Sequence, residues 1–381
     1  MDALTTPLPK AWQKVRLGDI AHVFDGTHQT PQYTHYGVAF FSVENIVSDK
    51  PSKFISQQDY LTATNQNRPE YNDILLTRIG TIGVSKVVNW NYPFSIYVTL
   101  AVIKQSKYFN SYYLHYFIQS NFFQKELKNN SLLQAIPCKI NMNELKKCEV
   151  ILPPLNEQIA IANVLSDLDH YLCSLDALIL KKEGVKKALR IKMLNQILAS
   201  NRVEFKKIGE ICLIKRGRVI AKKILQENGK YPVYSSQTLN NGILGFIDTY
   251  DFDGEFLTWT TDGAYAGSVF YRNGRFSITN VCGLLQVIQD NIIHKYLYYI
   301  LQITAPLHVN PGMGNPKLMS VAMQQIEIPL PPLNEQIAIA NVLSGLDHEI
   351  ISLKNKKRQF DNIKKALNHD LMSAKIRVLK E

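Results

Sequence analysis

The stretch LPPLNEQIAIANVLS occurs twice in this chain, at Leu152–Ser166 and again at Leu330–Ser344. After one mismatched position, the identity continues through Leu168–His170 and Leu346–His348, so that eighteen of nineteen positions agree. About 130–150 residues of differing sequence precede each copy. The chain therefore has the order domain, helix, domain, helix. We predict these four segments at residues 1–152, 153–199, 200–330 and 331–381.

Each copy of the repeat opens a long helical pattern. A proline pair ends the preceding segment, because proline lacks an amide donor and fixes φ. Asn156 and Asn334 are then expected as N-caps, with Glu157 and Glu335 in the first turn. The residues that follow are spaced alternately four and three apart, which is the coiled-coil period. The predicted seams are Ile161, Leu165, Leu168, Leu172, Leu175, Ile179, Lys182, Lys186, Leu189 and Met193, and Ile339, Leu343, Leu346, Ile350, Leu353, Lys357, Phe360, Lys364, Leu367 and Leu371.

A single helix of this kind exposes a seam that it cannot bury alone. Two copies in one chain favour packing on each other, and the intervening domain can return the chain so that they run antiparallel. The alternative is that each helix pairs with another subunit. Lys186 and Lys364 either fix the register of the pair or lie outside the contact.

The composition is that of a basic globular protein. Its 381 residues carry a net charge of +11, which suits a polyanionic partner. The N-terminus shows no secretory signal and no apolar run is long enough for a membrane span. The five cysteines are far apart and form no CxxC pair, so a reducing cytoplasm is expected. Neither a GxxxxGK[ST] loop nor an Asn/Asp-Pro-Pro-aromatic motif is present, so the chain is not predicted to be an enzyme.

The two domains share a plan although their sequences differ. In the first, a strand at Asp73–Arg78 leads through Gly80 and Gly83 into a second strand, and a helix is expected at Ser111–Ile118. The second repeats this order with Gly254–Thr260, Asp262–Tyr271 and a helix at His294–Leu301. A shared fold with different surfaces is expected of two recognition modules with different targets.

Polar and basic residues near turns are the candidates for DNA contact. Arginine on a rigid hairpin can donate to guanine O6 and N7, asparagine can pair with adenine, and clustered cations can approach phosphates. Surface ion pairs or solvated turns are the alternative for each of them. The candidate DNA-binding residues are Arg78, Lys86, Lys139, Asn141, Lys215, Arg216, Arg218, Lys222, Lys223, Arg272, Asn315 and Lys317, with no catalytic or metal-binding residue.

With these features the chain resembles the specificity subunit of Type I restriction-modification systems. The resemblance is carried by Pro154–Gln158 and Pro332–Gln336, each leading into its heptads, and by Asn72–Arg78, which is similar to the family's target-recognition domains. It implies an α/β fold with two target-recognition domains separated by two long antiparallel helices that form a coiled coil, with a pseudo-twofold internal repeat.

The resemblance also implies a function. Each domain would recognise one half of a bipartite DNA site, and the helices would set the unread spacer. The chain would hold no cofactor itself. It would dock two modification subunits, which bind S-adenosylmethionine, and restriction subunits, which use ATP with magnesium. The alternatives are a two-headed coiled-coil adaptor that does not bind DNA, and an enzyme that modifies DNA alone.

Overall fold

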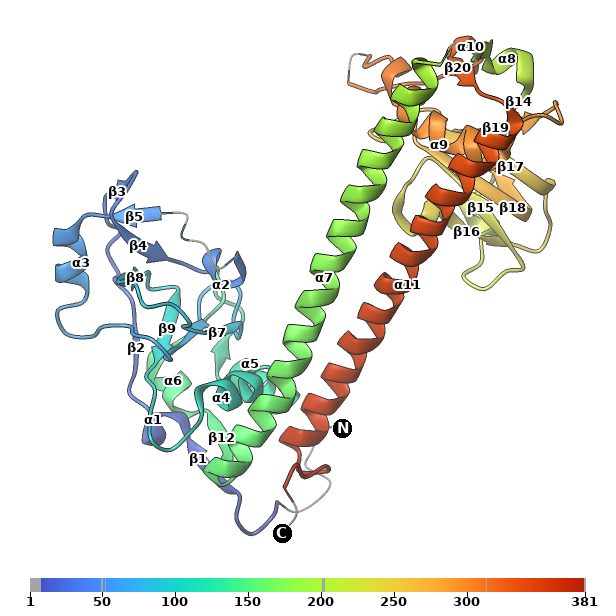
Figure 1. The fold of residues 1–381 in the computed structure, drawn as a ribbon. Coiled ribbons are helices and arrows are strands. Elements are labelled where there is room, and N and C mark those ends of the chain that lie inside the picture. Colours follow the sequence, from blue (N-terminus) through green and yellow to red (C-terminus); the bar gives the residue numbers. More distant parts are fainter. Residues whose placement is uncertain (1–7, 49–50, 52, 201–202, 313, 380–381) are drawn as a thin grey trace. The chain divides into compact units, whose positions relative to one another are not determined.

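The chain forms two compact units, each of which combines one globular domain with half of each long helix. The computed structural model describes residues 8–48, 51, 53–200, 203–312 and 314–379 (Figure 1). Unit 1 comprises residues 1–176 and 356–381, and unit 2 comprises residues 177–355. The four-segment division into 1–152, 153–199, 200–330 and 331–381 stays a prediction, and its outer bounds, residues 1 and 381, lie outside the described residues.

The two repeats begin the two long helices. Helix α7 spans Leu155–Leu198 and α11 spans Leu333–Met372. The predicted asparagine N-caps are wrong by two residues. The carbonyls of Pro154 and Pro332 accept the first helical hydrogen bonds, at 2.9–3.2 Å. Asn156 and Asn334 therefore lie inside the first turn. Proline can occupy the position before the helix because the first amide groups of a helix have no acceptor within it, so the missing N–H of proline costs no hydrogen bond.

In unit 1 the N-terminal half of α7 pairs with the C-terminal half of α11. The predicted seam is buried at Ile161, Leu165 and Leu172. Asp176 pairs with Lys357 at 2.7 Å, and the rings of Tyr171 and Phe360 lie 4.7 Å apart. The partner numbers fall on α11 as they rise on α7, so the two helix halves are antiparallel.

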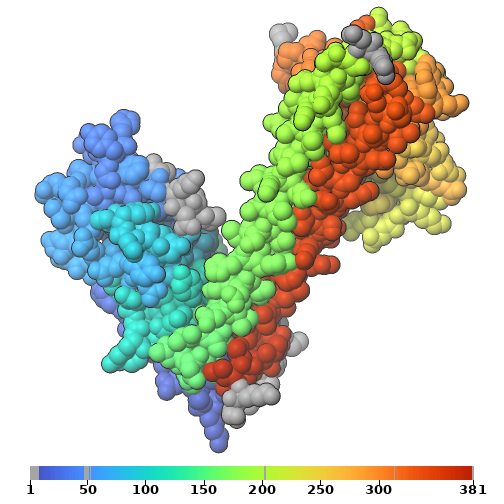
Figure 2. Space-filling view, viewed as in Figure 1, coloured from blue at the N-terminus to red at the C-terminus, as the bar shows by residue number. Residues whose placement is uncertain are grey.

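In unit 2 the remaining halves pair in the same way. Ile179, Leu343 and Ile350 are buried. Ion pairs join Glu183 to Lys354 at 2.7 Å and Lys182 to Glu349 at 2.5 Å, again in antiparallel order. In each unit the surface of α7 lies directly against that of α11 (Figure 2). The predicted intrachain antiparallel pairing is thus confirmed within both units.

The first domain is built from short strands in two four-stranded sheets, with helix α4 at Ser111–Ile118 as predicted. One sheet has the order β2-β9-β6-β7 and the other β3-β5-β4-β8, while β1 pairs with β12 and β10 with β11. The strands are β1 (Gln13–Arg16), β2 (Val23–Asp25), β3 (Tyr33–Thr34), β4 (Val38–Phe41), β5 (Lys53–Ile55), β6 (Ile74–Thr77), β7 (Ser85–Val87), β8 (Phe94–Ile96), β9 (Leu100–Ile103), β10 (Ser131–Leu132), β11 (Lys139–Ile140) and β12 (Glu149–Leu152). The other helices are α1 (Leu17–Ile20), α2 (Asn45–Ser48), α3 (Gln57–Ala63), α5 (Asn121–Asn129) and α6 (Met142–Lys147).

The second domain has one six-stranded sheet, with the order β14-β19-β17-β18-β15-β16, and a separate pair β13-β20. Its longest helix, α9 at His294–Thr304, covers the predicted one. The strands are β13 (Glu204–Lys207), β14 (Cys212–Arg216), β15 (Tyr231–Tyr234), β16 (Ile243–Ile247), β17 (Phe252–Thr260), β18 (Val269–Ile278), β19 (Cys282–Val287) and β20 (Glu327–Leu330). Its other helical elements are α8 (Ile208–Ile211), α10 (Ser320–Gln325), η1 (Lys222–Ile224), η2 (Leu239–Gly242) and η3 (Ala305–His308).

A buried glutamine of each repeat ties the long helix to its domain. Gln158 accepts a hydrogen bond from the amide of Asn110, the N-cap of α4, at 2.9 Å, and donates to the carbonyl of Pro153 at 2.8 Å. Gln336 makes the same contacts with the amide of Ile293, at the N-cap of α9, and with the carbonyl of Pro331, both at 3.0 Å. The amide side chain satisfies backbone groups that burial would otherwise leave unpaired.

All five cysteines are free thiols. Among the residues that the structure describes, every helix is too short or too polar to span a bilayer. Across the same ranges, no three His, Cys, Asp or Glu side chains gather closely enough to hold a metal ion.

Candidate nucleic-acid interface

A glycine turn follows β6 in the first domain, where the sequence predicted a hairpin. Thr77 begins it: its hydroxyl accepts from the amide of Val84 at 2.9 Å, and its carbonyl from the amide of Gly83 at 3.0 Å. Gly80 and Gly83 both have positive φ, +80° and +92°, which favours glycine. A Cβ on Gly80 would meet nothing within 4 Å, so this part of the turn faces open space.

The second domain has the same turn, one residue longer, between β17 and β18. The hydroxyl of Thr260 accepts from the amide of Ser268 at 3.2 Å, and its carbonyl from the amide of Gly267 at 2.9 Å. Gly263 and Gly267 have φ of +91° and +82°. A Cβ on Gly263 also meets nothing within 4 Å, whereas one on Gly267 would press on Val309 at 2.7 Å. Each turn thus has one glycine toward open space and one toward the protein.

A lysine pairs with each turn from a distant segment. Lys139 forms a β-bridge with Ile79, and Lys317 forms one with Asp262. The adjacent hydrogen bonds also correspond, since Gly80 donates to the Cys138 carbonyl at 2.8 Å and Gly263 donates to the Pro316 carbonyl at 3.0 Å. The structure therefore makes Lys139 and Lys317 equivalent. The side chain of Lys317 is exposed and that of Lys139 half-buried.

The two candidate asparagines lie beside these lysines. Asn141 is exposed at the N-cap of α6, and its side chain makes no capping hydrogen bond. Asn315 is exposed two residues before Lys317. Lysine and asparagine next to an open glycine turn form a surface that a phosphate backbone can approach closely. Among the predicted residues, the structure groups these four around two equivalent turns.

The basic run of the second domain is exposed but partly paired. Arg218 donates from Nε to both carboxylate oxygens of Asp251, at 3.1 and 3.0 Å. Arg216 donates from Nη2 to the Asn280 carbonyl at 2.6 Å. The remaining cations of the run, Lys215 at the end of β14 and Lys222 and Lys223 in η1, are also exposed.

The prediction that Arg78 and Arg272 project from hairpins is wrong, because the structure buries both. Arg78 pairs with Asp25 at 3.0 Å and donates to the Val98 carbonyl at 2.8 Å. Arg272 donates to Thr258 Oγ1 at 3.1 Å, and its guanidinium lies 3.5 Å from the ring centroid of Tyr234. Burial lowers the pKa of both arginines. Their side chains hold their own domains together, and we remove them from the candidate DNA contacts.

Lys86 lies in β7, opposite Leu75, and is half-buried. It is not part of the open turn formed around Gly80, so its contact with DNA stays a prediction.

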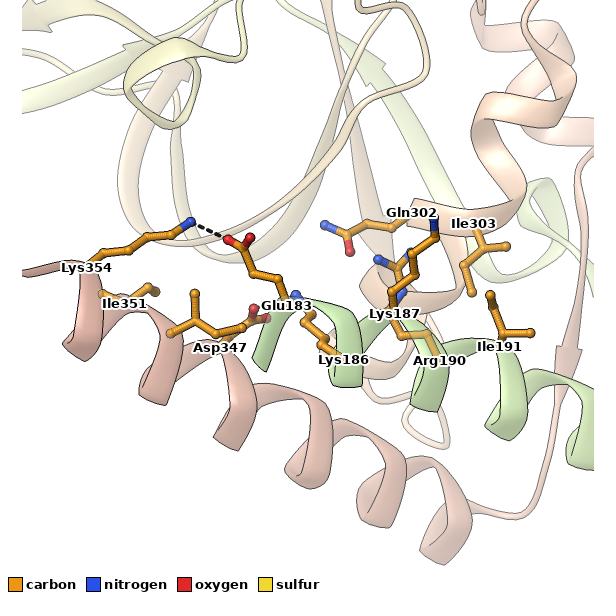
Figure 3. Close-up of a pocket in the computed structure, with 11 residues that line it drawn as sticks. Glu183, Lys186, Lys187, Arg190, Ile191, Gln302, Ile303, Asp347, Ile351 and Lys354 are labelled. Carbon is orange, nitrogen blue, oxygen red and sulfur yellow. Dashed lines mark hydrogen bonds and ion pairs between the residues drawn. The ribbon is translucent and has the colours of Figure 1, made fainter. Parts of the chain in front are cut away.

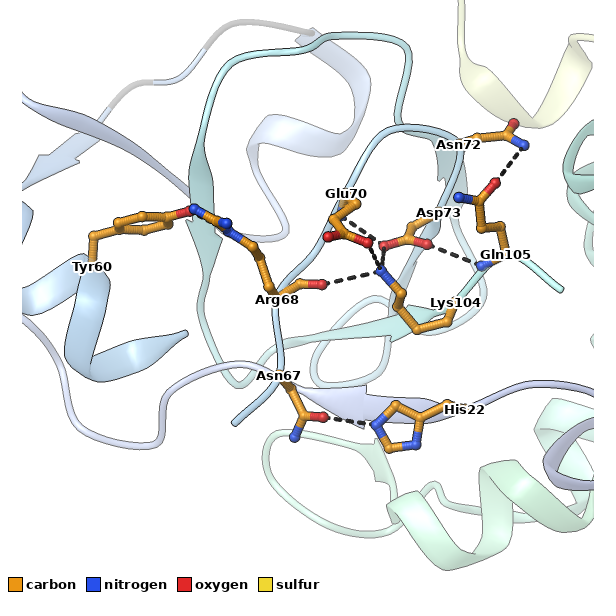
Figure 4. Close-up of polar contacts among 9 residues, drawn as sticks. All are labelled: His22, Tyr60, Asn67, Arg68, Glu70, Asn72, Asp73, Lys104 and Gln105. Atoms are coloured by element: carbon orange, nitrogen blue, oxygen red, sulfur yellow. Dashed lines mark hydrogen bonds and ion pairs between the residues drawn. The ribbon is translucent and has the colours of Figure 1, made fainter. Parts of the chain in front are cut away.

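The stretch Asn72–Arg78, which carried part of the resemblance, begins with a buried network of hydrogen bonds around Asp73. Asp73 is fully buried, and its carboxylate accepts from Lys104 at 2.9 Å and from the amides of Glu70 and Gln105 at 2.7 and 2.9 Å (Figure 4). Asn72 has a φ of +68°, in the left-handed region that asparagine tolerates. These contacts fix the backbone at the start of β6, the strand that precedes the glycine turn. This part of the motif therefore has a structural role.

Unit 2 also contains a cavity of about 590 Å³ where α7, α11 and α9 meet (Figure 3). Its lining mixes isoleucines with charged side chains of both signs, including Ile191, Arg190, Glu183 and Asp347. The Nε of Arg190 is buried without a hydrogen-bond partner among the described residues, and burial lowers the pKa of this arginine.

Comparison with known proteins agrees with this duplicated architecture. The family model described as the Type I restriction modification DNA specificity domain matches residues 9–182 and 201–360. The chain belongs to this Type I specificity family. A putative type I specificity subunit of Mycoplasma pneumoniae is 52% identical over 138 residues, which are 36% of this chain and 74% of the relative. A second one from this organism is 40% identical over 211 residues, or 53% and 82% of the two chains.

A solved structure shows the same fold. The crystal structure of a Type I restriction-modification S subunit from M. genitalium matches with a TM-score of 0.69 and 17% identity, covering 97% of this chain and 99% of the other. The chain is thus a specificity subunit with two DNA specificity domains, two long helices and an internal repeat. The alternative of an adaptor that does not bind DNA has no support.

Sequence reasoning missed two things in these domains. It placed Lys139 and Lys317 in loops without seeing that they are equivalent, because the hydrogen bonds that align them join residues that are far apart in the sequence, Gly80 with Cys138 and Gly263 with Pro316. It also gave Gln158 and Gln336 no role beyond the motif. A signal was available: a polar residue kept identical in both repeats, while the domains differ, indicates a contact common to both.

Proposed function

We propose that the chain recognises a bipartite DNA site, with one half-site bound by each domain at its glycine turn. The equivalence of the two turns supports this most directly. Each combines a glycine facing open space with a bridged lysine, Lys139 or Lys317. An exposed asparagine lies near each lysine, although not at equivalent positions: Asn141 follows Lys139 by two residues and Asn315 precedes Lys317 by two. The lysines would contact phosphates and the asparagines base edges. The exposed run Lys215–Lys223 would add phosphate contacts in the second domain.

The two long helices would set the unread spacer. Helix α7 has 44 residues, which at a rise of 1.5 Å per residue is about 66 Å. Seven residues inserted into α7 after Ala177, with seven inserted into α11 before Asn355, would lengthen the pair by about 10 Å and keep the heptad phase. The preferred spacer should then grow by roughly three base pairs, at 3.4 Å per pair, while the half-sites stay the same.

The chain would act without catalysis of its own, through partner subunits. Modification subunits would carry S-adenosylmethionine, and restriction subunits would carry ATP with magnesium. The long helices offer exposed apolar residues for docking, among them Ile159 and Ile363 in unit 1 and Leu180 and Ile351 in unit 2. In unit 2, the cavity at Ile191 and Arg190 would receive part of a modification subunit.

The decisive experiment is co-expression with candidate modification subunits, followed by sequencing of methylated adenines. We expect one bipartite motif with a fixed spacer. Lys139→Ala should weaken methylation at one half-site and Lys317→Ala at the other. Each should lower the salt slope of DNA binding by about one. Lys365→Ala, an exposed lysine on α11, is the matched control. Methylation by this chain alone, or the absence of any sequence preference in the complex, would refute the proposal.

A further inference from the structure

Each unit contains a three-residue contact that joins the domain to both long helices at once. In unit 1, the Tyr116 hydroxyl of α4 donates to Asp169 Oδ2 at 2.8 Å, and Lys364 of α11 donates to Asp169 Oδ1 at 2.5 Å. The Lys364 ammonium also lies 5.3 Å from the centroid of the Tyr116 ring. We name this contact the Tyr–Asp–Lys latch.

Unit 2 contains the same latch with the helices exchanged. The Tyr299 hydroxyl of α9 donates to Asp347 Oδ2 at 2.7 Å, and Lys186 of α7 donates to Asp347 Oδ1. Lys186 lies 5.4 Å from the centroid of the Tyr299 ring. Asp169 and Asp347 are the aspartates of the repeated Leu-Asp-His triplet, so one sequence repeat supplies the centre of both latches.

The latch and the glutamine contact differ in which parts of the unit they join. Gln158 joins α7 to the first domain but does not involve α11 in its hydrogen bonds. Asp169 lies eleven residues further along α7, about 16 Å away, and its two oxygens are shared between the domain and the opposite helix. The side chain of Lys364 is only 20% exposed, which strengthens a charged contact relative to one in water.

The latches accept only one register of the two helices. A slip by one heptad in one direction would place Lys357 opposite Asp169, but the same slip places Ile179 opposite Asp347. The reverse slip brings Leu371 and Met193 to these positions. Because α7 and α11 are continuous helices, one slip acts on both latches. No heptad slip therefore gives both aspartates a cationic partner.

We propose that Asp169 and Asp347 are positioning residues that couple the helix register to the orientation of each recognition domain, and so sharpen the spacer that the subunit accepts. This proposal rests on the proposed function, in which the helices set the spacer. In each latch the aspartate of one long helix binds a tyrosine of the domain and a lysine of the other long helix. It therefore links the position of the domain to the position of both helices.

The test compares variants of the full chain in complex with modification subunits. One variant carries Tyr116→Phe and Tyr299→Phe, and another carries Asp169→Asn and Asp347→Asn. The control carries Asp176→Asn and Lys357→Gln, which breaks an ion pair of the same helices at an exposed position. Sequencing of methylated adenines gives, for fixed half-sites, the ratio of methylation at the preferred spacer to methylation one base pair longer or shorter.

Both latch variants should lower this ratio roughly tenfold or more, because each removes a charge-assisted hydrogen bond from both latches, with the half-site bases unchanged. The control should stay within about twofold. Exchanging the charges, with Asp169→Lys and Lys364→Asp, should restore part of the helix contact but not the tyrosine contact. An unchanged ratio in both latch variants would overturn the proposal, as would a loss of half-site recognition at every spacer in the Tyr→Phe variant.

Small-angle X-ray scattering of the chain alone separates this proposal from the proposed function. The latch variants should broaden the distribution of interatomic distances, and the control should not. An unchanged distribution would overturn the latch even if the wild-type complex methylates a bipartite site. A broadened distribution together with no sequence preference in the wild-type complex would refute the proposed function and leave the latch as a purely mechanical contact, which also contradicts its role in spacer choice.

Discussion

Units 1 and 2 use the same contacts to join a domain to the helices, yet fill the space around those contacts differently. In unit 1, helix α5 follows α4, and its Phe122 stacks on His369 of α11 at 5.6 Å. In unit 2, the position equivalent to His369 is Ile191, the short η3 directly follows α9 in the place of α5, and the cavity of about 590 Å³ lies there. The comparison shows that the two copies of the repeat attach their domains to the long helices in the same way. The residues that pack around these contacts differ from one domain to the other.

The largest expected difference between the two domains is the loss of stability caused by one substitution at equivalent positions of their sheets. Gly283 of β19 lies opposite Trp259 of β17, and an added Cβ would come within 2.2 Å of the buried indole. The corresponding pair in the first domain is Ala101 and Leu76. Gly283→Ala should destabilise the second domain by about 3 kcal/mol or more, because the tryptophan must move. Ala101→Gly should cost only about 1 kcal/mol. Hydrogen exchange followed domain by domain would measure both, and equal costs would contradict this difference between the sheets.

The glutamine contacts should be alike in the two units. Gln158→Ala and Gln336→Ala each leave a partly buried amide and a buried proline carbonyl without partners, at a cost of about 2–3 kcal/mol. Urea unfolding of the full chain, with hydrogen exchange to locate the loss, would give the free-energy change in each unit. The exposed Asn156→Ala provides the control and should stay within about 0.5 kcal/mol. A large loss in only one unit would show that the repeats do not attach their domains equivalently.

The stability of the two units should depend differently on pH, because α4 has a histidine at a position where α9 has a tyrosine. Burial, followed by the nearby Lys364, lowers the pKa of His115 from 6.5 to about 4, and the ring lies 2.9 Å from Ser85 Oγ. The unfolded chain then binds more protons below pH 6.5, so unit 1 should lose stability as the pH falls from about 6.5 to 4. The loss should be about 1–3 kcal/mol, since the ring is only half-buried.

His115→Gln should remove this pH dependence from unit 1. Unit 2 has Tyr298 at the equivalent place, and burial raises the pKa of that tyrosine, so it does not titrate in this range. Thermal denaturation of wild type and variant at pH 7 and pH 5 would measure the effect. Equal losses in the wild type and in His115→Gln would assign the pH dependence to other groups.

The smallest expected difference lies in the helix seam. At equivalent positions, unit 1 has the ring pair Tyr171–Phe360 and unit 2 has the ion pair Lys182–Glu349. Salt at 1 M should weaken only the ion pair, by less than about 1 kcal/mol. Hydrogen exchange at low and high salt would detect it as faster exchange of the amides next to Lys182 and Glu349 than of those next to Tyr171 and Phe360. An equal response at both places would contradict this difference.

Much of this molecule was determined by its sequence. The repeat, the heptad spacing and the proline pairs predicted two long helices and two domains, because helix period and chain punctuation are local properties. Helix α4 was placed to the residue, and the glycine turns were placed correctly, since a positive φ strongly favours glycine. The lysines of the seam were also identified, although their partners were not.

Only the tertiary structure decided which charged side chains face solvent. Arg78 and Arg272 looked like surface residues of hairpins, but Asp25 and Tyr234 come from distant strands to surround them. Lys139 and Lys317 became equivalent for the same reason, through bridges between segments far apart in the chain. Burial, ion pairing and the Tyr–Asp–Lys latch depend on long-range contacts, and the local pattern that fixes a helix or a turn carries no information about which distant group will meet it.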